Sequence, residues 1–187
     1  MSAALASDNE IGELIEAIRV ERDDAPQLVD MLIDRYRDDP RLHFMKGSLL
    51  AGSGRAIEAH RCMSRAVELA PDYSLARYQL GFFELTSGRP QQALSTWGPL
   101  LAEGEESCFR KFVEGMTHLI RDEFPAAIAL FEQGMALNRA NEPINDDVRL
   151  LIGECRRLQG QNQSDPSPEH SATSVILGQF GASKTIQ

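Results

Sequence analysis

A repeat of 34 residues is the sequence feature that most constrains how this chain can fold. It occupies Pro40 to Asn141 as three copies that align without a gap. A glycine recurs at the eighth position, an alanine at the twentieth and a bulky apolar residue at the twenty-fourth. These are Gly47, Gly81 and Gly115; Ala59, Ala93 and Ala127; and Met63, Trp97 and Phe131. A fixed period with residue sizes in constant phase predicts stacked helical hairpins.

Each copy is predicted to be a helix, a turn and a second helix. The fifteenth position carries Gly54, Gly88 and Asp122, which are residue types that tolerate the backbone angles that end a helix. The small residues at the eighth and twentieth positions let two helix backbones approach, and we expect the bulky residue to fill the gap between hairpins. A single hairpin cannot bury its apolar face alone, so the copies must stack. The sequence therefore predicts an all-α fold, an α-solenoid.

The pattern resembles that of the tetratricopeptide repeat family. The first copy carries the resemblance best, through Ala59, Ala66 and the ending Ala-Val-Glu-Leu-Ala-Pro71. The chain departs from the family at the fourth position of the repeat. Family members often have Trp at this position, whereas the three copies have His43, Arg77 and Lys111. The resemblance implies a right-handed superhelix of hairpins whose concave groove, lined by the first helix of each copy, binds an extended or helical peptide.

Four segments follow along the chain. Residues 1–39 are predicted to form a degenerate hairpin that serves as an acidic cap, and residues 40–141 to form the three repeats 40–73, 74–107 and 108–141. Residues 142–160 are predicted to form a capping helix that begins with Asp146 as its N-cap. Residues 161–187 are rich in Gln, Ser, Pro and Gly, so we expect a flexible tail, with one apolar run from Val175 to Phe180.

Composition narrows the classes of function. The net charge is -9, and residues 1–39 hold eleven acids against four arginines. Without a basic stripe the chain is a poor binder of nucleic acid or anionic membrane. Three cysteines in no paired spacing, Cys62, Cys108 and Cys155, fit a reducing compartment. With no signal peptide and no segment able to span a bilayer, we expect a cytoplasmic protein that does not insert into membranes.

No catalytic or metal-binding motif stands out. The glycine-rich stretch from Gly47 to Arg55 lacks the Lys-Ser/Thr pair of a phosphate loop. His60 and Cys62 are two residues apart on a predicted helix, so their side chains point in different directions, which argues against a shared metal. We therefore expect no enzymatic activity, no cofactor and no metal.

The predicted binding site is an apolar stripe on the first helices of the repeats. Leu75, Tyr78, Phe82 and Leu85 follow at helical spacing in the second copy, so they share one face. The predicted groove residues are Phe44, Tyr78, Phe82, Leu85, Phe109, Phe112, Met116 and Leu119, with Arg41, Arg77 and Lys111 at the margins to select nearby acids. The alternative is that the stripe is simply core, as aromatic stripes often are.

Two functional hypotheses follow. The first is a non-enzymatic protein interaction module, an adaptor or chaperone-like protein that binds an apolar segment of a partner in the groove. Family members that hold acidic chaperone tails use a clamp of Lys, Asn and Arg, which this face lacks. The second is a structural assembly subunit, a homo-oligomer that self-associates through the stripe or through the tail segment from Val175 to Phe180.

Overall fold

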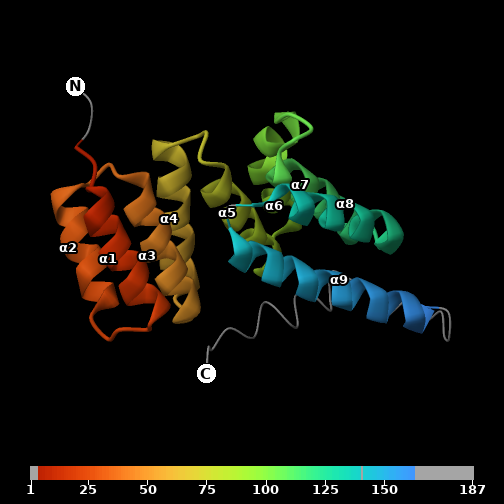
Figure 1. Ribbon diagram of the computed structural model, residues 1–187, viewed down its shortest axis with the longest axis horizontal. Helices are drawn as coiled ribbons and strands as arrows, with labels where there is room; N and C mark the ends of the chain where they lie inside the picture. Colours follow the sequence, from red (N-terminus) through yellow and green to blue (C-terminus); the bar gives the residue numbers. More distant parts are fainter. Residues whose placement is uncertain (1–3, 140, 163–187) are drawn as a thin grey trace. The chain divides into compact units, whose positions relative to one another are not determined.

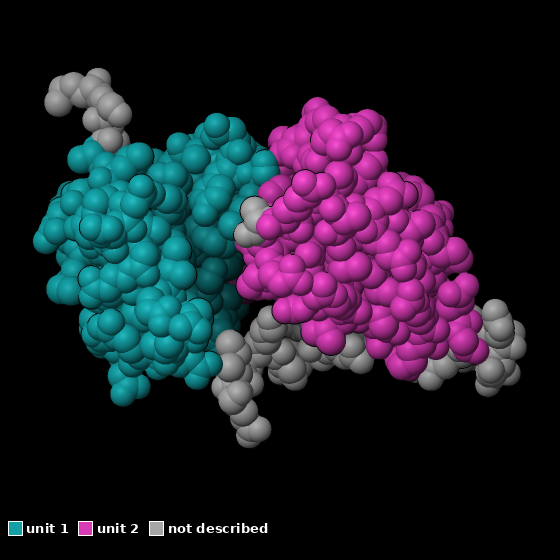
Figure 2. Space-filling view, viewed as in Figure 1, with its two compact units in different colours: residues 1–80, 185–187 teal, residues 81–184 magenta. Residues whose placement is uncertain are grey.

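The computed structural model describes residues 4–139 and 141–162. Every regular element in these two ranges is helical, which confirms the all-α prediction (Figure 1). The chain forms two compact units, which Figure 2 shows in separate colours. The boundary falls inside one helix, between Leu80 and Gly81. The predicted tail, with its apolar run, lies outside the described residues except for its first two positions.

Unit 1 contains four complete helices and the start of a fifth. These are α1 (Asp8–Arg19), α2 (Ala25–Arg35), α3 (Pro40–Gly52), α4 (Ala56–Leu69) and the first half of α5 (Ser74–Thr86). Consecutive helices pack against each other, α1 on α2, α2 on α3 and α3 on α4. The core of the first three helices includes Leu14 from α1, Val29 from α2 and Leu42 from α3. The first 39 residues thus supply a helical pair that covers α3.

Unit 2 contains the remaining helices. After the end of α5 come α6 (Pro90–Trp97), the short 3-10 helix η1 (Gly98–Ala102), α7 (Cys108–Ile120), α8 (Phe124–Leu137) and α9 (Glu142–Asn162). The helix α6, which is the second helix of repeat 74–107, is short because Pro99 follows Gly98. A proline lacks the backbone N–H that would continue the α-helix. The predicted start of the last helix at Asp146 is wrong: α9 begins at Glu142, and Asp146 instead pairs with Arg149 at 2.6 Å.

In each repeat the bulky side chain at the twenty-fourth position packs directly against the glycine at the eighth position. A Cβ built on Gly47 would lie 2.6 Å from Met63, and one on Gly115 would lie 2.6 Å from Phe131. A Cβ on Gly81 would overlap the indole of Trp97. The bulky residues therefore fill the space inside their own hairpins, which corrects the expectation that they lie between hairpins.

The turns use the predicted residues. Gly54 and Gly88 adopt φ values of +74° and +76°, and Asp122 adopts +60°. This left-handed region suits glycine and tolerates aspartate, and it lets the chain reverse after the first helix of each repeat. The fifteenth position therefore ends the helix as expected.

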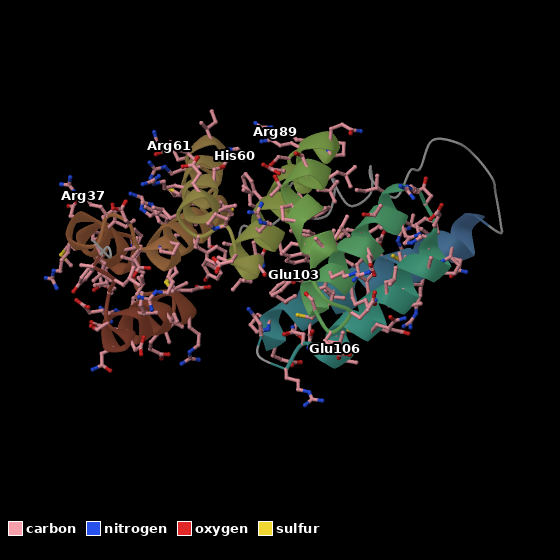
Figure 3. All side chains as sticks on the ribbon, turned by 90° about the horizontal axis from the view of Figure 1, so that it is seen from above. Arg37, His60, Arg61, Arg89, Glu103 and Glu106 are labelled. Carbon is pink, nitrogen blue, oxygen red and sulfur yellow. The ribbon has the colours of Figure 1, made fainter. Side chains whose placement is uncertain are left out.

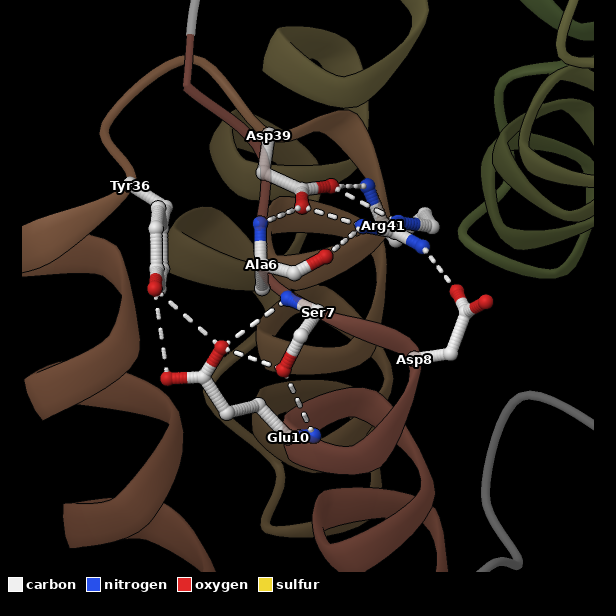
Figure 4. A network of polar contacts seen from close by, with 7 residues as sticks. All are labelled: Ala6, Ser7, Asp8, Glu10, Tyr36, Asp39 and Arg41. Carbon is white, nitrogen blue, oxygen red and sulfur yellow. Dashed lines mark hydrogen bonds and ion pairs between the residues drawn. The ribbon is translucent and has the colours of Figure 1, made fainter.

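A polar network ties the start of the chain to the start of α3 (Figure 4). Asp39 is buried, and its carboxylate accepts hydrogen bonds from the backbone N–H of Ala6 and of Arg41, both at 3.0 Å. The Arg41 guanidinium donates to Asp39 at 2.8 Å and to the carbonyl of Ala6 at 2.6 Å. Next along the chain, Ser7 and Glu10 form a capping box at the start of α1. Asp39 thus both caps α3 and holds the segment that leads into α1.

Replacing Gly81 with alanine should lower the free energy of unfolding by about 1–3 kcal/mol, because the new methyl group would overlap Trp97 in a tightly packed hairpin. The matched control is Gly153→Ala in α9, where a Cβ would have no other atom within 4 Å and alanine favours the helix by about 0.5–1 kcal/mol. Urea unfolding followed by helical circular dichroism and by the fluorescence of the single tryptophan measures both. Equal stability of the two variants would contradict the packing role.

Replacing Asp39 with asparagine should lower the free energy of unfolding by about 1–3 kcal/mol, since the amide has no charge and offers Ala6 and Arg41 one acceptor oxygen in place of two. Burial raises the pKa of Asp39, but the hydrogen bonds from Arg41 and Ala6 outweigh it and leave the pKa below its ordinary value of 3.8. Its contribution to stability is therefore complete above that value and is lost as the pH falls through the lowered pKa.

Urea unfolding at a series of pH values checks this expectation. The wild type should lose the Asp39 contribution below its ordinary pKa of 3.8, and Asp39→Asn should lack that part of the pH dependence. Asp34→Asn is the control, because Asp34 is exposed and has no ion pair within the described ranges. A wild-type pH dependence retained in full by Asp39→Asn would rule out this role.

Candidate binding surfaces

The eight residues of the predicted groove divide by burial. Five are buried, and three keep part of their surface exposed. The buried ones are Tyr78, Leu85, Phe112, Met116 and Leu119, and the partly exposed ones are Phe44, Phe82 and Phe109. Buried side chains cannot contact a peptide at the surface of this structure. For these five residues the structure favours the alternative in which the stripe is core.

Phe112 shows why part of the stripe is buried. It lies on α7, and a Cβ built on Gly134 of α8 would lie 2.5 Å from its ring. Phe112 therefore faces the second helix of its own hairpin. Phe109 lies one turn earlier on α7 and meets the Phe112 ring edge-on, with 6.5 Å between centroids. The partly exposed ring of Phe109 thus rests on a buried one.

In unit 1 the partly exposed aromatic residue is Phe44 on α3. Its ring packs edge-on against Tyr73, with 5.7 Å between centroids. Burial raises the pKa of the Tyr73 phenol, as expected for a side chain placed among apolar neighbours. The partly exposed ring of Phe44 thus also rests on a neighbouring ring.

The three predicted margin residues all have acceptors inside the chain. Arg41 belongs to the network with Asp39, and Arg77 donates to the carbonyl of Pro71 at 2.9 Å. The Lys111 ammonium lies 2.6 Å from Glu105 and 3.4 Å from Glu114. Glu105 and Glu114 thus already occupy the position that an acidic group of a ligand would take beside Lys111.

A second surface, which sequence reasoning missed, is a cleft in unit 1. Its volume is about 600 Å³, and its walls come from α2, α3 and α4. We call it the cationic cleft, and its lining residues are Ile33, His43, Lys46, His60, Arg61, Cys62, Ser64, Arg65 and Glu68. Three cations and two imidazoles line it, with one acid. The cleft therefore offers cationic groups on an acidic protein, and two of them, Lys46 and Arg65, are ion-paired with the bordering acids Asp30 and Asp38.

The net charge of the whole chain gives no sign of the cations at this cleft. Residues 40–69, which form α3 and α4, hold five arginines and lysines against two glutamates, whereas the 39 residues before them have a net charge of -7. His60 and Cys62 line the same cleft although they are two residues apart on α4. No group of three His, Cys, Asp or Glu side chains that could hold a metal ion occurs in the described ranges.

Neither a protein-family model nor a curated protein matches the chain. Among solved structures, one described as "MamA RS-1 ArsTM double mutant" is similar, with 14% sequence identity and a TM-score of 0.56. The match covers 91% of this chain and 89% of that one. MamA is a tetratricopeptide-repeat protein. The chain has the fold of a helical-repeat solenoid. At this identity the likeness shows the fold alone.

The cysteines of this solenoid are free thiols. Burial raises the pKa of Cys62 and of Cys108, and it raises the pKa of Cys155 to about 11. A raised pKa keeps a thiol protonated near neutral pH and so makes it a poor nucleophile. A helix long and apolar enough to cross a membrane does not occur in the part of the chain that the structure describes.

The three thiols should react with a disulfide reagent such as DTNB in an order set by burial. Cys108 is half-buried and should react first. Cys62, 9% exposed at the cleft, should react more slowly, and Cys155, which is fully buried, should react only as the protein opens. Stopped-flow absorbance on single-cysteine variants measures each rate, with the urea-unfolded protein as the control for full reactivity. Native Cys155 modified at the unfolded rate would contradict its placement.

Proposed function

We propose that this protein is a non-enzymatic interaction module that binds an apolar peptide segment of a partner protein. The observation that carries the proposal is the exposure of Phe44, Phe82 and Phe109. These residues lie on α3, α5 and α7, the first helices of the three repeats. Each repeat therefore presents one aromatic ring that is partly open to solvent.

Two of these rings are suited to binding because each already packs on a neighbouring aromatic side chain. Phe44 rests on Tyr73, and Phe109 rests on Phe112. An apolar side chain of a peptide would bury the ring area that is still exposed, at about 25 cal/mol per Å² of apolar surface. Little side-chain freedom is lost when an aromatic residue held by its neighbours enters an interface.

The fold supports binding over catalysis. Stacked hairpins present continuous helix surfaces that are suited to holding a chain segment. The thiols, which would be the strongest nucleophiles, have raised pKa values. The predicted absence of a cofactor and the cytoplasmic location remain expectations from the sequence.

The second candidate function is that of a structural assembly subunit. The observation that favours it is the exposure of large apolar side chains in unit 1, where Met31 on α2 is 62% exposed and Ile57 on α4 is 84% exposed. A second copy of the chain would bury them. The tail segment from Val175 to Phe180 is the other predicted contact and lies outside the described residues.

Replacing Phe82 with aspartate should abolish capture of the partner, because a charge placed on the ring position cannot be buried against an apolar segment. The matched control is Leu150→Asp, which makes the same change at a 60% exposed position of α9. Pull-down with mass spectrometry identifies the partner. Fluorescence anisotropy with the synthesised segment then measures affinity, and circular dichroism checks that each variant keeps its helices. Phe109→Asp is the second test variant.

Three results decide between the candidates. Binding that Phe82→Asp and Phe109→Asp lose and Leu150→Asp keeps supports the apolar site. Binding retained by both phenylalanine variants contradicts it. If only further copies of the chain are recovered, and light scattering shows a discrete oligomer, the assembly function replaces it.

A further inference from the structure

We propose that the cationic cleft of unit 1 binds an acidic segment of a partner protein. This site is separate from the aromatic residues of the proposed function, and its ligand has the opposite chemistry. All of its lining residues belong to unit 1, and six of them come from α4. His60 and Arg61 occupy adjacent positions on that helix (Figure 3).

The shape of the cleft suits a short stretch of peptide. Its lining on α4 extends from His60 to Glu68, which spans about 12 Å along a helix that rises 1.5 Å per residue. Ile33 from α2 and Lys46 from α3 complete the hollow. An extended segment of about four residues covers the same length. The cleft therefore accepts a few side chains of a peptide laid along α4.

Arg61 is the cation available to a ligand. It is exposed, and its side chain forms no ion pair or hydrogen bond with any residue in the described ranges. The nearest acid toward the start of α4, Glu58, is already paired with Arg55. An arginine offers two parallel N–H donors to a carboxylate, which makes it the best single anchor for an acidic side chain.

The other two cations of the cleft hold exposed acids that a ligand could replace. The Lys46 ammonium lies 2.6 Å from Asp30, and the Arg65 guanidinium lies 3.1 Å from Asp38 and 3.4 Å from Glu68. The three acids are more than half exposed. Solvent-exposed pairs of this kind contribute about 0–1 kcal/mol each. Exchanging them for ligand carboxylates therefore costs little.

The surroundings favour a peptide over a nucleic acid. Asp30, Asp38 and Glu68 border the cleft, and the first 39 residues have a net charge of -7. A nucleic acid extends its row of phosphates beyond a short cleft and would meet this acidic surface. A peptide with two or three carboxylates confines its charge to the cleft.

Apolar groups at the cleft define the segment further. Ile33 is part of its lining. Ile57, which is 84% exposed, lies three residues before His60 and four before Arg61, so it shares their side of α4. The fitting ligand is therefore an acidic segment that also carries an apolar side chain.

The test uses a short fluorescein-labelled peptide of glutamates with one leucine, titrated with the full chain and followed by anisotropy. Arg61→Glu should weaken binding on the order of tenfold, because it removes a charge-assisted pair and adds repulsion. Arg89→Glu is the matched control, since Arg89 is exposed, lies in unit 2 and forms no side-chain ion pair in the described part of the chain (Figure 3). Added salt should weaken the wild-type complex.

Nuclear magnetic resonance with the same peptide locates the site, with shifts expected at the amides of His60, Arg61 and Ser64. The proposal is overturned if the wild type does not bind the peptide at low salt, if both arginine variants weaken it equally, or if the shifts fall elsewhere. Tighter binding of a single-stranded oligonucleotide, or dimerisation through the cleft, would also overturn it. Phe82→Asp should bind the peptide normally, so this test and that of the proposed function fail independently.

Discussion

The contact between a backbone glycine and the bulky side chain opposite it sets the distance between the two helices of each hairpin. Gly47, Gly81 and Gly115 have no Cβ, so Met63, Trp97 and Phe131 lie directly on the helix backbone. Dispersion attraction is short-ranged, and this close approach gives each large side chain a full set of neighbours. The alanine at the twentieth position is buried in every repeat and keeps the second helix equally close. The absence of a Cβ at these three glycines therefore sets the spacing of the helices within each hairpin.

The third repeat has a second contact of this kind, in which the glycine is on the second helix and the ring is on the first. Phe131 on α8 lies on Gly115 of α7, and Phe112 on α7 lies on Gly134 of α8. In the first repeat the position of Gly134 is held by Ala66, and the position of Phe112 is held by Phe44. There Phe44 stays partly exposed and packs on Tyr73. In the second repeat Leu100 holds the position of Gly134, and Tyr78, at the position of Phe112, is buried all the same. The burial of a ring at this position therefore depends on all of its surroundings and not on one residue of the facing helix.

This dependence explains how far the sequence could predict the molecule. The 34-residue period indicates where helices begin, because Pro40, Ser74 and Cys108 each open both a repeat and a helix. It also indicates the turns at Gly54, Gly88 and Asp122. The period does not indicate which rings are exposed, because equivalent positions differ in burial: Phe44 is partly exposed, whereas Tyr78 and Phe112 are buried. Nor does it reveal the cationic cleft, whose walls come from three helices and whose charge disappears in an average over the chain.

The cationic residues of the cleft are not required by the repeat. His60, Arg61, Ser64 and Arg65 of the first copy correspond to Leu94, Ser95, Gly98 and Pro99 in the second, and to Ile128, Ala129, Glu132 and Gln133 in the third. Hairpins therefore form with apolar, small or acidic residues at these positions, because the contacts between helices lie on the other side, at Ala59 and Met63. The packing of a hairpin therefore does not require a cation at these positions. The cluster of Lys46, Arg61 and Arg65 at the cleft is thus a property of this one hairpin, and recognition of an acidic segment is a reason for it that packing does not supply.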